Sequence, residues 1–175
     1  MSLIAGVAAI LAGVLTADAK KAADDAAEYA AIENLIDRTF AAIAADDPEM
    51  WRPLLTDEAR NLSFRPDRNG PKGALSMRDE SYKEVLADMT PGDPRLFYER
   101  WIGEPTVLVD GPVAIVWGRY DFWIDGVFSH CGVDTLNLAK IDGAWKIAHF
   151  MYTVELEGCA TAGDAAPEGA RASPE

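Results

Sequence analysis

The chain is short of basic residues, with 16 lysines and arginines against 29 aspartates and glutamates, which gives a formal net charge of −13 at pH 7. Nucleic acids and anionic membranes require a basic patch, so this balance argues against both as partners. Only two histidines are present, and their separation along the predicted strands disfavours a shared metal site. The sequence also lacks a glycine-rich phosphate loop and a serine nucleophile elbow. We therefore expect no metal and no cofactor.

Long apolar runs are also missing. The stretch from Leu3 to Leu15 is too short to span a membrane, and it precedes Ala17-Asp18-Ala19, which fits the small-x-small rule of signal peptidase. We predict a signal peptide over residues 1–19, a periplasmic or secreted protein, and no membrane contact after cleavage. An uncleaved N-terminal anchor helix is the alternative, because Met1-Ser2 supplies no lysine or arginine before the run.

Cysteine is scarce, with Cys131 and Cys159 as the two thiols. In an oxidising compartment an even count suggests a disulfide, so this pair is a disulfide candidate. The chain would have to fold back after Glu157 for the sulfurs to meet, and Gly158 would permit that. Two free thiols are the alternative.

A chain of 175 residues, nearly half of them apolar, can bury one core. We expect one α+β domain over residues 20–158, with helices packed on one face of an antiparallel sheet, and a disordered tail over 159–175 that is rich in alanine, glycine, proline and acid. Apolar spacing and turn residues predict a helix near 24–46 capped by Asp24 or Asp25, a second near 48–55, and a third that Ser76 caps and that ends near Met89. They predict strands at 60–66, 72–77, 96–109, 113–124, 127–140 and 144–156.

Two Asp-Gly turns, Asp125-Gly126 and Asp142-Gly143, predict tight hairpins between the last three strands. Two-residue turns pair Ile124 with Val127 and Ile141 with Ala144, and period-two alternation then assigns each side chain to a face. In this register Asp121 lies opposite His130, and Asp134 lies between Trp117 and Met151. One face thereby collects Trp117, Arg119, Asp121, Trp123, His130, Asp134, His149 and Met151.

This mixture of large apolar and ionisable side chains is typical of a ligand pocket. Asp121 opposite His130 can form a base-and-orienter dyad, with Asp134 as a second acid. Arg119 can clamp an anion, and the aromatic, histidine and methionine side chains around it can line the ligand. Each of these groups also has a purely structural alternative. The dyad can be a structural hydrogen bond at the rim of the sheet, Asp134 can belong to a buried ion pair, and His149 can be a hydrogen-bonded core residue.

The predicted strands leave the facing of one segment open and expose a second apolar face. The turn at Asp110-Gly111-Pro112 can be read as two or three residues, so the facing of residues 97–101 stays open. The opposite sheet face carries apolar residues as well, including Val116, Tyr120 and Phe150, and helices can cover only one face. We therefore expect a homodimer through the outer sheet face.

The stretches YERWIGEPTVLVDGPVAIVWGRYDFWIDG, FSHCGVDTLNLAKIDGAWKI and VELEGC, together with the earlier DDPEMWRPLLTDEA, resemble the SnoaL-like or lumazine-binding-like bacterial branch of the nuclear transport factor 2-like superfamily. The resemblance implies a cone-shaped curved antiparallel sheet wrapped around a long N-terminal helix, a pocket at the open end of the cone, and frequent homodimerisation. It implies no single reaction, because the superfamily includes isomerases, dehydratases, hydrolases and non-catalytic binding modules.

Three functions remain open from the sequence. The first is an exported domain that binds a small, largely apolar or aromatic molecule. The second is a cofactor-independent acid–base enzyme, an isomerase, dehydratase or hydrolase, that uses the His130/Asp121 dyad with Asp134 and Arg119. The third is a dimeric structural module without a ligand.

Overall fold

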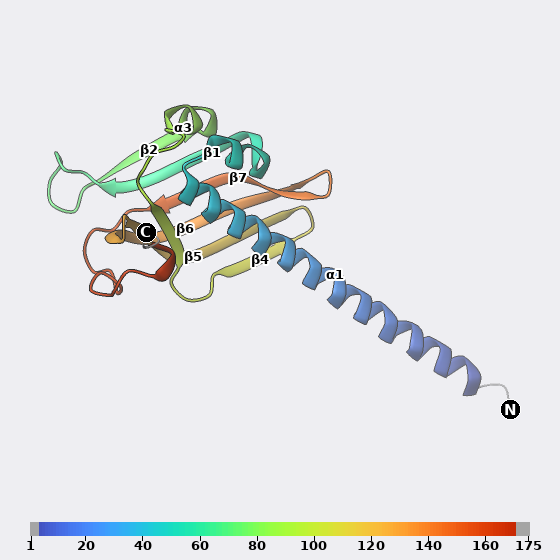
Figure 1. Cartoon of the computed structure of the whole chain (residues 1–175). Helices are drawn as coiled ribbons and strands as arrows, with labels where there is room; N and C mark the ends of the chain where they lie inside the picture. Colours follow the sequence, from blue (N-terminus) through green and yellow to red (C-terminus); the bar gives the residue numbers. More distant parts are fainter. Residues whose placement is uncertain (1–3, 171–175) are drawn as a thin grey trace. The chain divides into compact units, whose positions relative to one another are not determined.

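The structure is a computed structural model that describes the backbone of residues 4–170 and the side chains of residues 19–170. Figure 1 shows a long N-terminal helix followed by a strongly curved sheet. The helices are α1 (Ile4–Ala45), α2 (Pro48–Trp51) and α3 (Tyr82–Asp88), with short 3-10 turns η1 (Arg52–Leu54) and η2 (Glu168–Ala170). The strands are β1 (Leu55–Pro66), β2 (Leu75–Ser81), β3 (Phe97–Trp101), β4 (Thr106–Asp110), β5 (Val113–Ile124), β6 (Val127–Ile141) and β7 (Ala144–Thr153).

The chain divides into two compact units, one ending at Asn34 and one beginning at Leu35. The helix predicted from Asp24 begins at Ile4 instead, and Asp24 and Asp25 do not cap it but pair with Lys20 and Lys21 one turn earlier. No helix in the described part of the chain is both long and apolar enough to cross a membrane. Residues 1–3 of the predicted signal peptide lie outside the described residues, so its cleavage stays a prediction.

The second unit is built on a seven-stranded open sheet in the order β2-β1-β7-β6-β5-β3, with β4 paired to the other half of β5. The sheet is mixed, because β1 runs parallel to β7, whereas the sequence predicts antiparallel pairing throughout. The predicted strand 96–109 is divided into β3 and β4. The break holds Gly103 at a positive φ and Pro105, which lacks the N–H that a continuous ladder needs.

Both Asp-Gly turns form as predicted, with Asp125, Gly126, Asp142 and Gly143 all at positive φ. The ladders beyond them, however, each contain a β-bulge. Trp123 pairs with Phe128 but Phe122 pairs with His130, which leaves Ser129 as an extra residue. A second bulge at Ala148 shifts the pairing of β6 with β7. Every predicted pair beyond a bulge is therefore displaced by one residue, and the predicted faces change with it.

The core of the second unit lies on the concave side of the sheet. Val116, Leu136 and Phe150 point inward from neighbouring strands and are buried. Phe40, near the end of α1, packs edge-on against Trp101 of β3, with ring centroids 5.3 Å apart. The final turns of α1 thus cover one end of the concave face and leave room for a cavity beside them.

The segment after β7 is held to the sheet by a disulfide between Cys131 and Cys159, whose Cα atoms lie 5.8 Å apart. It then continues to η2, where Gly169 lies directly against the ring of Tyr98 and Ala170 is buried. The sequence predicts disorder from residue 159, but the structure gives residues 159–170 a defined path because the disulfide and the Gly169 contact fix it. Residues 171–175 of the predicted tail lie outside the described residues.

Candidate functional site

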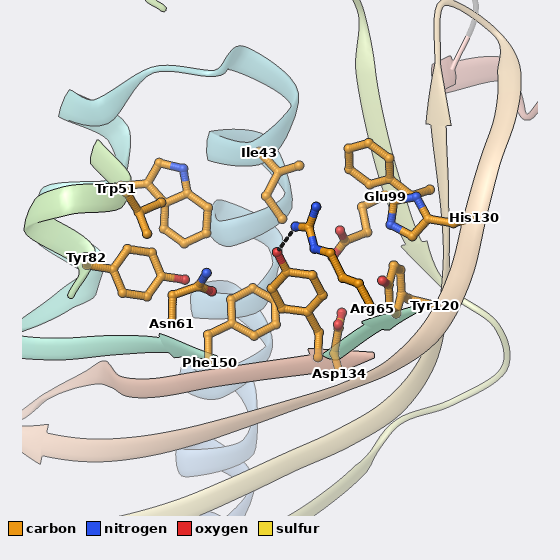
Figure 2. Close-up of a pocket in the computed structure, with 13 residues that line it drawn as sticks. Ile43, Trp51, Asn61, Arg65, Tyr82, Glu99, Tyr120, His130, Asp134 and Phe150 are labelled. Carbon is orange, nitrogen blue, oxygen red and sulfur yellow. Dashed lines mark hydrogen bonds between the residues drawn. The ribbon is translucent and has the colours of Figure 1, made fainter. Parts of the chain in front are cut away.

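A cavity of about 330 Å³ opens on the concave side of the sheet. Figure 2 shows its lining side chains, which come from the end of α1, from α2 and α3, and from strands β1, β3, β5, β6 and β7. Six aromatic residues form most of the wall: Trp51, Tyr82, Tyr120, Phe122, Phe150 and Tyr152. Five polar or charged residues interrupt it: Asn61, Arg65, Glu99, His130 and Asp134. Ligand pockets usually combine apolar walls with a few convergent polar groups in this way.

Glu99 of β3 and Asp134 of β6 form a pair of carboxyl groups in this cavity. Asp134 is only 1% exposed, and the two side chains are within hydrogen-bonding reach of each other. Burial raises the pKa of Glu99 to about 7, and the nearby charge of Asp121 adds to this rise. Burial and then the charge of Glu99 raise the pKa of Asp134 well above its usual value. The pair therefore keeps a proton up to neutral pH.

Three buried polar atoms of the cavity residues have no hydrogen-bond partner among the described residues. They are Glu99 Oε1, Asp134 Oδ2 and Trp51 Nε1, two acceptors and one donor. Leaving a buried polar group unsatisfied costs about 1–3 kcal/mol, so native proteins rarely keep several together without a reason. The proton that the carboxyl pair keeps can join Glu99 to Asp134, whereas Trp51 Nε1 needs an acceptor that a ligand could supply.

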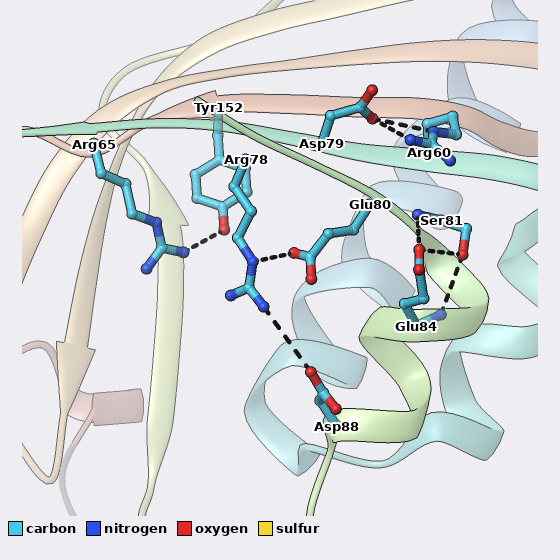
Figure 3. A network of polar contacts seen from close by, with 9 residues as sticks. All are labelled: Arg60, Arg65, Arg78, Asp79, Glu80, Ser81, Glu84, Asp88 and Tyr152. Atoms are coloured by element: carbon cyan, nitrogen blue, oxygen red, sulfur yellow. Dashed lines mark hydrogen bonds and ion pairs between the residues drawn. The ribbon is translucent and has the colours of Figure 1, made fainter. Parts of the chain in front are cut away.

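The helix α3 positions Tyr82 as its first residue. Ser81 caps the helix: its hydroxyl accepts from the backbone N–H of Glu84, and its own N–H donates to the Glu84 carboxylate at 2.8 Å (Figure 3). The sequence predicts a cap at Ser76 instead, but β2 extends to Ser81 and places Ser76 inside a strand. Tyr82 then packs on Trp51 with ring centroids 5.3 Å apart. These two rings close one side of the cavity.

Tyr82 and Tyr120 are held as neutral phenols in the cavity wall. Tyr120 donates its hydroxyl to the backbone carbonyl of Thr153 at 2.8 Å, and burial raises the pKa of Tyr120 far above its usual range. Burial likewise raises the pKa of Tyr82. The hydroxyl of Tyr152 accepts from Nη2 of Arg65 at 2.8 Å (Figure 3). Arg65 thereby lies on the Tyr152 side of the cavity.

His130 is enclosed by aromatic rings. Its imidazole stacks on Phe122 with centroids 5.0 Å apart, meets the edge of Tyr120 at 5.7 Å, and its Nδ1 lies 3.0 Å from the Ser129 hydroxyl. Burial, with a smaller contribution from the charge of Arg65, lowers the pKa of His130 to about 4. The imidazole is therefore neutral at physiological pH and is a weak base there.

The predicted His130/Asp121 dyad is wrong. Because Ser129 is the extra residue of a bulge, Asp121 pairs with Cys131 instead of His130. The side chains of Asp121 and His130 therefore point to opposite faces of the sheet. Asp121 is fully buried, and its carboxylate accepts from Nε and Nη2 of Arg100 at 3.0 and 3.1 Å. The structure thus uses Asp121 in a two-pronged ion pair that anchors β3 to β5.

Of the ten predicted site residues, including the two cysteines, the cavity contains two, His130 and Asp134. The bulge at Ser129 places the even-numbered residues of β6 on the same face as the even-numbered residues of β5, so the predicted partners on β5 point the other way. Arg119 and Trp117 are exposed on the outer face, Trp117 at 46%. The following residues also lie outside the cavity: Trp123, buried against Phe128; His149, opposite Asn137; and Met151, opposite Thr135.

Sequence reasoning missed Glu99, Trp51 and Tyr82, and it wrongly assigned Tyr120 and Phe150 to the outer face of the sheet, whereas both line the cavity. Glu99 was one of the residues whose facing stayed open, and a pairing of Arg100 with Asp121 would have settled it, because neighbouring residues on a strand point to opposite faces. Trp51 and Tyr82 belong to short helices outside the predicted sheet, and no periodicity in the sequence links them to β6. The described residues contain no group of three or more His, Cys, Asp and Glu side chains that could hold a metal.

Comparisons with solved structures place this chain in a known fold. A nuclear transport factor 2-like superfamily protein from Salmonella enterica aligns over 75% of this chain and 94% of its own at 18% identity, with a TM-score of 0.55. A variant of a protein of unknown function from Mycobacterium tuberculosis aligns over 77% of this chain and 75% of its own at 17% identity, with a TM-score of 0.57. A proposed β subunit of an aromatic-ring-hydroxylating dioxygenase from Novosphingobium aromaticivorans aligns over 79% and 95% at 14% identity, with a TM-score of 0.57.

No family model matches the sequence, and no curated protein matches it. At these identities the likeness concerns the fold. The chain is an α+β domain with the nuclear transport factor 2-like fold, as the sequence resemblance implied, and this domain carries a cavity lined by aromatic rings and a buried carboxyl pair.

Proposed function

We propose that this chain is a binding domain for a small, largely apolar or aromatic molecule whose polar end meets Glu99 and Asp134. The cavity volume of about 330 Å³ falls within the range of about 300–1,000 Å³ that is usual for ligand pockets. The aromatic walls suit an apolar body. The observation that carries the proposal is Asp134 Oδ2, a buried carboxyl oxygen in the cavity wall that has no partner among the described residues.

The structural neighbours support this proposal only through their fold. One of them is described as a proposed subunit of a dioxygenase that acts on aromatic rings, and others are of unknown function. One fold can host many activities, so the site must carry the argument.

A second candidate function is a cofactor-independent acid–base enzyme, an isomerase, dehydratase or hydrolase. The pKa of Glu99, raised to about 7, favours it, because a carboxyl with that pKa can accept and return a proton at neutral pH. In this version Asp134 keeps its predicted role as an acid, and Glu99 replaces the His130/Asp121 dyad as the base. Under this candidate Glu99→Gln abolishes turnover, whereas under the binding function it changes affinity only.

We also propose that the domain is exported and that it pairs with a second copy. The Cys131–Cys159 disulfide supports export, because disulfides persist mainly in oxidising compartments. Exposed Leu108, Ile115 and Trp117 on the outer side of β4 and β5 support pairing through that face. Measurement of molar mass in solution tests the pairing, and a monomer at every concentration would contradict it.

The indole N–H of Trp51 offers a direct test of the binding function. It is buried, lies in the cavity wall and has no acceptor among the described residues. In ¹H–¹⁵N spectra, a ligand that enters the cavity is expected to shift the Trp51 indole signal, while that of the exposed Trp117 on the outer face stays in place. A panel of small aromatic amines, alcohols and acids should yield at least one such compound. Shifts that affect both tryptophans equally, or neither with any compound, would contradict the proposal.

A further inference from the structure

We propose that the ligand of this cavity is a cation, a small apolar or aromatic amine whose ammonium group binds between the carboxyl groups of Glu99 and Asp134. This inference rests on the proposed binding function and names the chemical class of its ligand. It follows from the hydrogen-bonding capacity of the site, its charge and its aromatic walls.

The buried carboxyl oxygens of Glu99 and Asp134 need hydrogen-bond donors. Glu99 Oε1 and Asp134 Oδ2 are buried and have no donor among the other described residues, so in the empty site they depend on the proton that the pair keeps. An alcohol brings one donor and a ketone brings none, whereas a primary ammonium group brings three. An ammonium group can therefore satisfy both oxygens at once, and these charge-assisted hydrogen bonds are stronger than neutral ones.

The charges around the two carboxyl groups also favour a cation. Among the described residues, no lysine or arginine contributes to the pKa of either carboxyl group, and the charged neighbours that do contribute are acidic. Arg100 is committed to Asp121 on the other face of the sheet. Arg65 also lines the cavity, but it is exposed, and its guanidinium donates to the Tyr152 hydroxyl. A buried carboxylate without a counter-ion is costly, and a bound cation would provide one.

The aromatic side chains in the cavity wall also favour a cation. Figure 2 shows the rings of Trp51, Tyr82 and Phe150 on the side of the cavity away from His130, and these rings line the same cavity as the two carboxyl groups. Aromatic faces attract cations, by about 2 kcal/mol or more when the pair is desolvated. The net charge of −13 also favours the approach of a cation and disfavours that of an anion.

Binding of the cation must displace a proton. The empty pair holds a proton near neutral pH, so the reaction is the exchange of that proton, released to solvent, for the ammonium ion, whose own nitrogen stays protonated. Affinity should therefore rise with pH through about 7, the pKa of Glu99. The other groups around the pair are Arg65 on β1, Tyr82 on α3, Tyr120 and Asp121 on β5, His130 on β6 and Tyr152 on β7. His130, with a pKa of about 4, is neutral in this window, and burial keeps Tyr82 and Tyr120 protonated.

The test uses probes that share one body and differ in charge: tryptamine, tryptophol and indole-3-acetate, with 2-phenylethylamine, 2-phenylethanol and phenylacetate as a second set. Affinities of the full chain are measured by isothermal titration calorimetry from pH 6 to pH 8. We expect each amine to bind at least about tenfold more tightly than its alcohol at pH 8, and the acids to bind most weakly. Between pH 6 and pH 8 the amine affinity should rise about tenfold, and titrations in buffers of different ionisation enthalpy should detect the released proton.

Substitutions of the two carboxyl groups test whether they cause the preference for the amine. Glu99→Gln and Asp134→Asn each should reduce the preference for the amine over the alcohol to within about threefold, while the alcohol affinity changes little. Glu104→Gln is the matched control, because Glu104 is exposed and outside the cavity, so it removes one negative charge without touching the site. Melting temperatures show that each variant is folded before its affinity is compared.

Alcohols that bind as tightly as the amines, or amine affinity that falls as the pH rises, would overturn the ammonium inference and leave the binding function standing. Equal loss of amine preference in Glu104→Gln would overturn it as well, because the effect would then come from net charge. If none of the six probes binds and the Trp51 indole signal never shifts, both the inference and the proposed function are overturned.

Discussion

Glu99 and Asp134 come from strands that are not neighbours in the sheet, yet their carboxyl groups meet in one cavity, where burial raises the pKa of both and the charge of Glu99 raises that of Asp134 further. β5 lies between them, and a side chain at Gly118, which pairs with Asp134, would collide with the ring of Trp101 from β3, so glycine lets β3 lie close above this strand. The curvature of the sheet then brings β3 over β6. Two acids that repel each other in a dry site are a cost to the fold, so the cavity that they face is the best candidate for function.

The first prediction concerns the ion pair between Arg100 and Asp121. Asp121→Asn should destabilise the protein by about 2 kcal/mol, because it leaves the half-buried Arg100 without its carboxylate partner. Urea unfolding with a fixed slope measures this loss. The substitution should leave the cavity intact, so the Trp51 indole signal should keep its position. A stability change below about 0.5 kcal/mol would show that the pair is not structural.

The second prediction concerns pH. The pKa of His130 is lowered to about 4, so it contributes stability above pH 6.5, and that contribution is lost as the pH falls toward 4. The pKa of Glu99 is raised to about 7, so it contributes stability below pH 4.5, and that contribution is lost as the pH rises toward 7. Each contribution is about 3 kcal/mol at most. Burial raises the pKa of Asp134 as well, so both carboxyl groups oppose His130, and the stability of the native protein should fall as the pH rises from about 4.5 to 6.5.

Single substitutions should expose the two halves of this balance. Glu99→Gln should make this fall shallower, because His130 then opposes Asp134 alone, and His130→Gln should make it steeper, because neither carboxyl group is then opposed. Free energies of unfolding in urea, measured at each half pH unit, give both profiles. Two profiles with the same slope would refute the assignment of these pKa values.

The third prediction concerns the close approach of β6 to β7. A Cβ at Gly132 would collide with the backbone carbonyl of Thr153 and would lie 2.7 Å from the ring of Tyr120. Backbone cannot move aside as a side chain can, so Gly132→Ala should cost about 2–3 kcal/mol or prevent folding. Gly163→Ala is the control, because nothing lies within 4 Å of its added Cβ. Equal melting temperatures for the two variants would contradict the register of β6.

The fourth prediction concerns the disulfide. Cys131 and Cys159 are separated by 28 residues, and a loop of that size contributes about 3.6 kcal/mol on the chain-entropy estimate. Replacement of both cysteines by serine should lower the free energy of unfolding by about this amount and should release the segment from 159 to 170 to proteolysis. Cleavage of that segment at the same rate with and without the disulfide would contradict its anchoring role.

Much of the fold was predictable from local chemistry. The two Asp-Gly turns, the last three strands and the short helix begun by Asp47 and Pro48 all follow from residues that favour those structures by themselves. The start of α3 was misplaced because Ser76 and Ser81 both offer capping patterns. Pairing of β1 with β7 was not predictable, since it joins segments from opposite ends of the domain and depends on their packing.

The site was less predictable, and for one main reason. A bulge adds a single residue, and no local signal distinguishes Ser129 or Ala148 as the extra one, yet each reverses which side chains share a face. Asp134 was identified because a carboxylate among apolar residues is conspicuous on any face. His130 was identified for its chemistry, but its predicted partner was wrong, and the actual partner of Asp134 lay on a strand of undecided facing.

The most direct test of the account is the titration of the carboxyl groups themselves, by ¹³C nuclear magnetic resonance of the ligand-free protein with Glu99→Gln and Asp134→Asn to assign the signals. The account predicts one carboxyl carbon that titrates near pH 7, from Glu99, and an Asp134 signal that titrates well above the usual aspartate range. Titration of every Asp and Glu below about pH 5 would show that the two carboxyls do not share a buried site, and it would contradict the account at its centre.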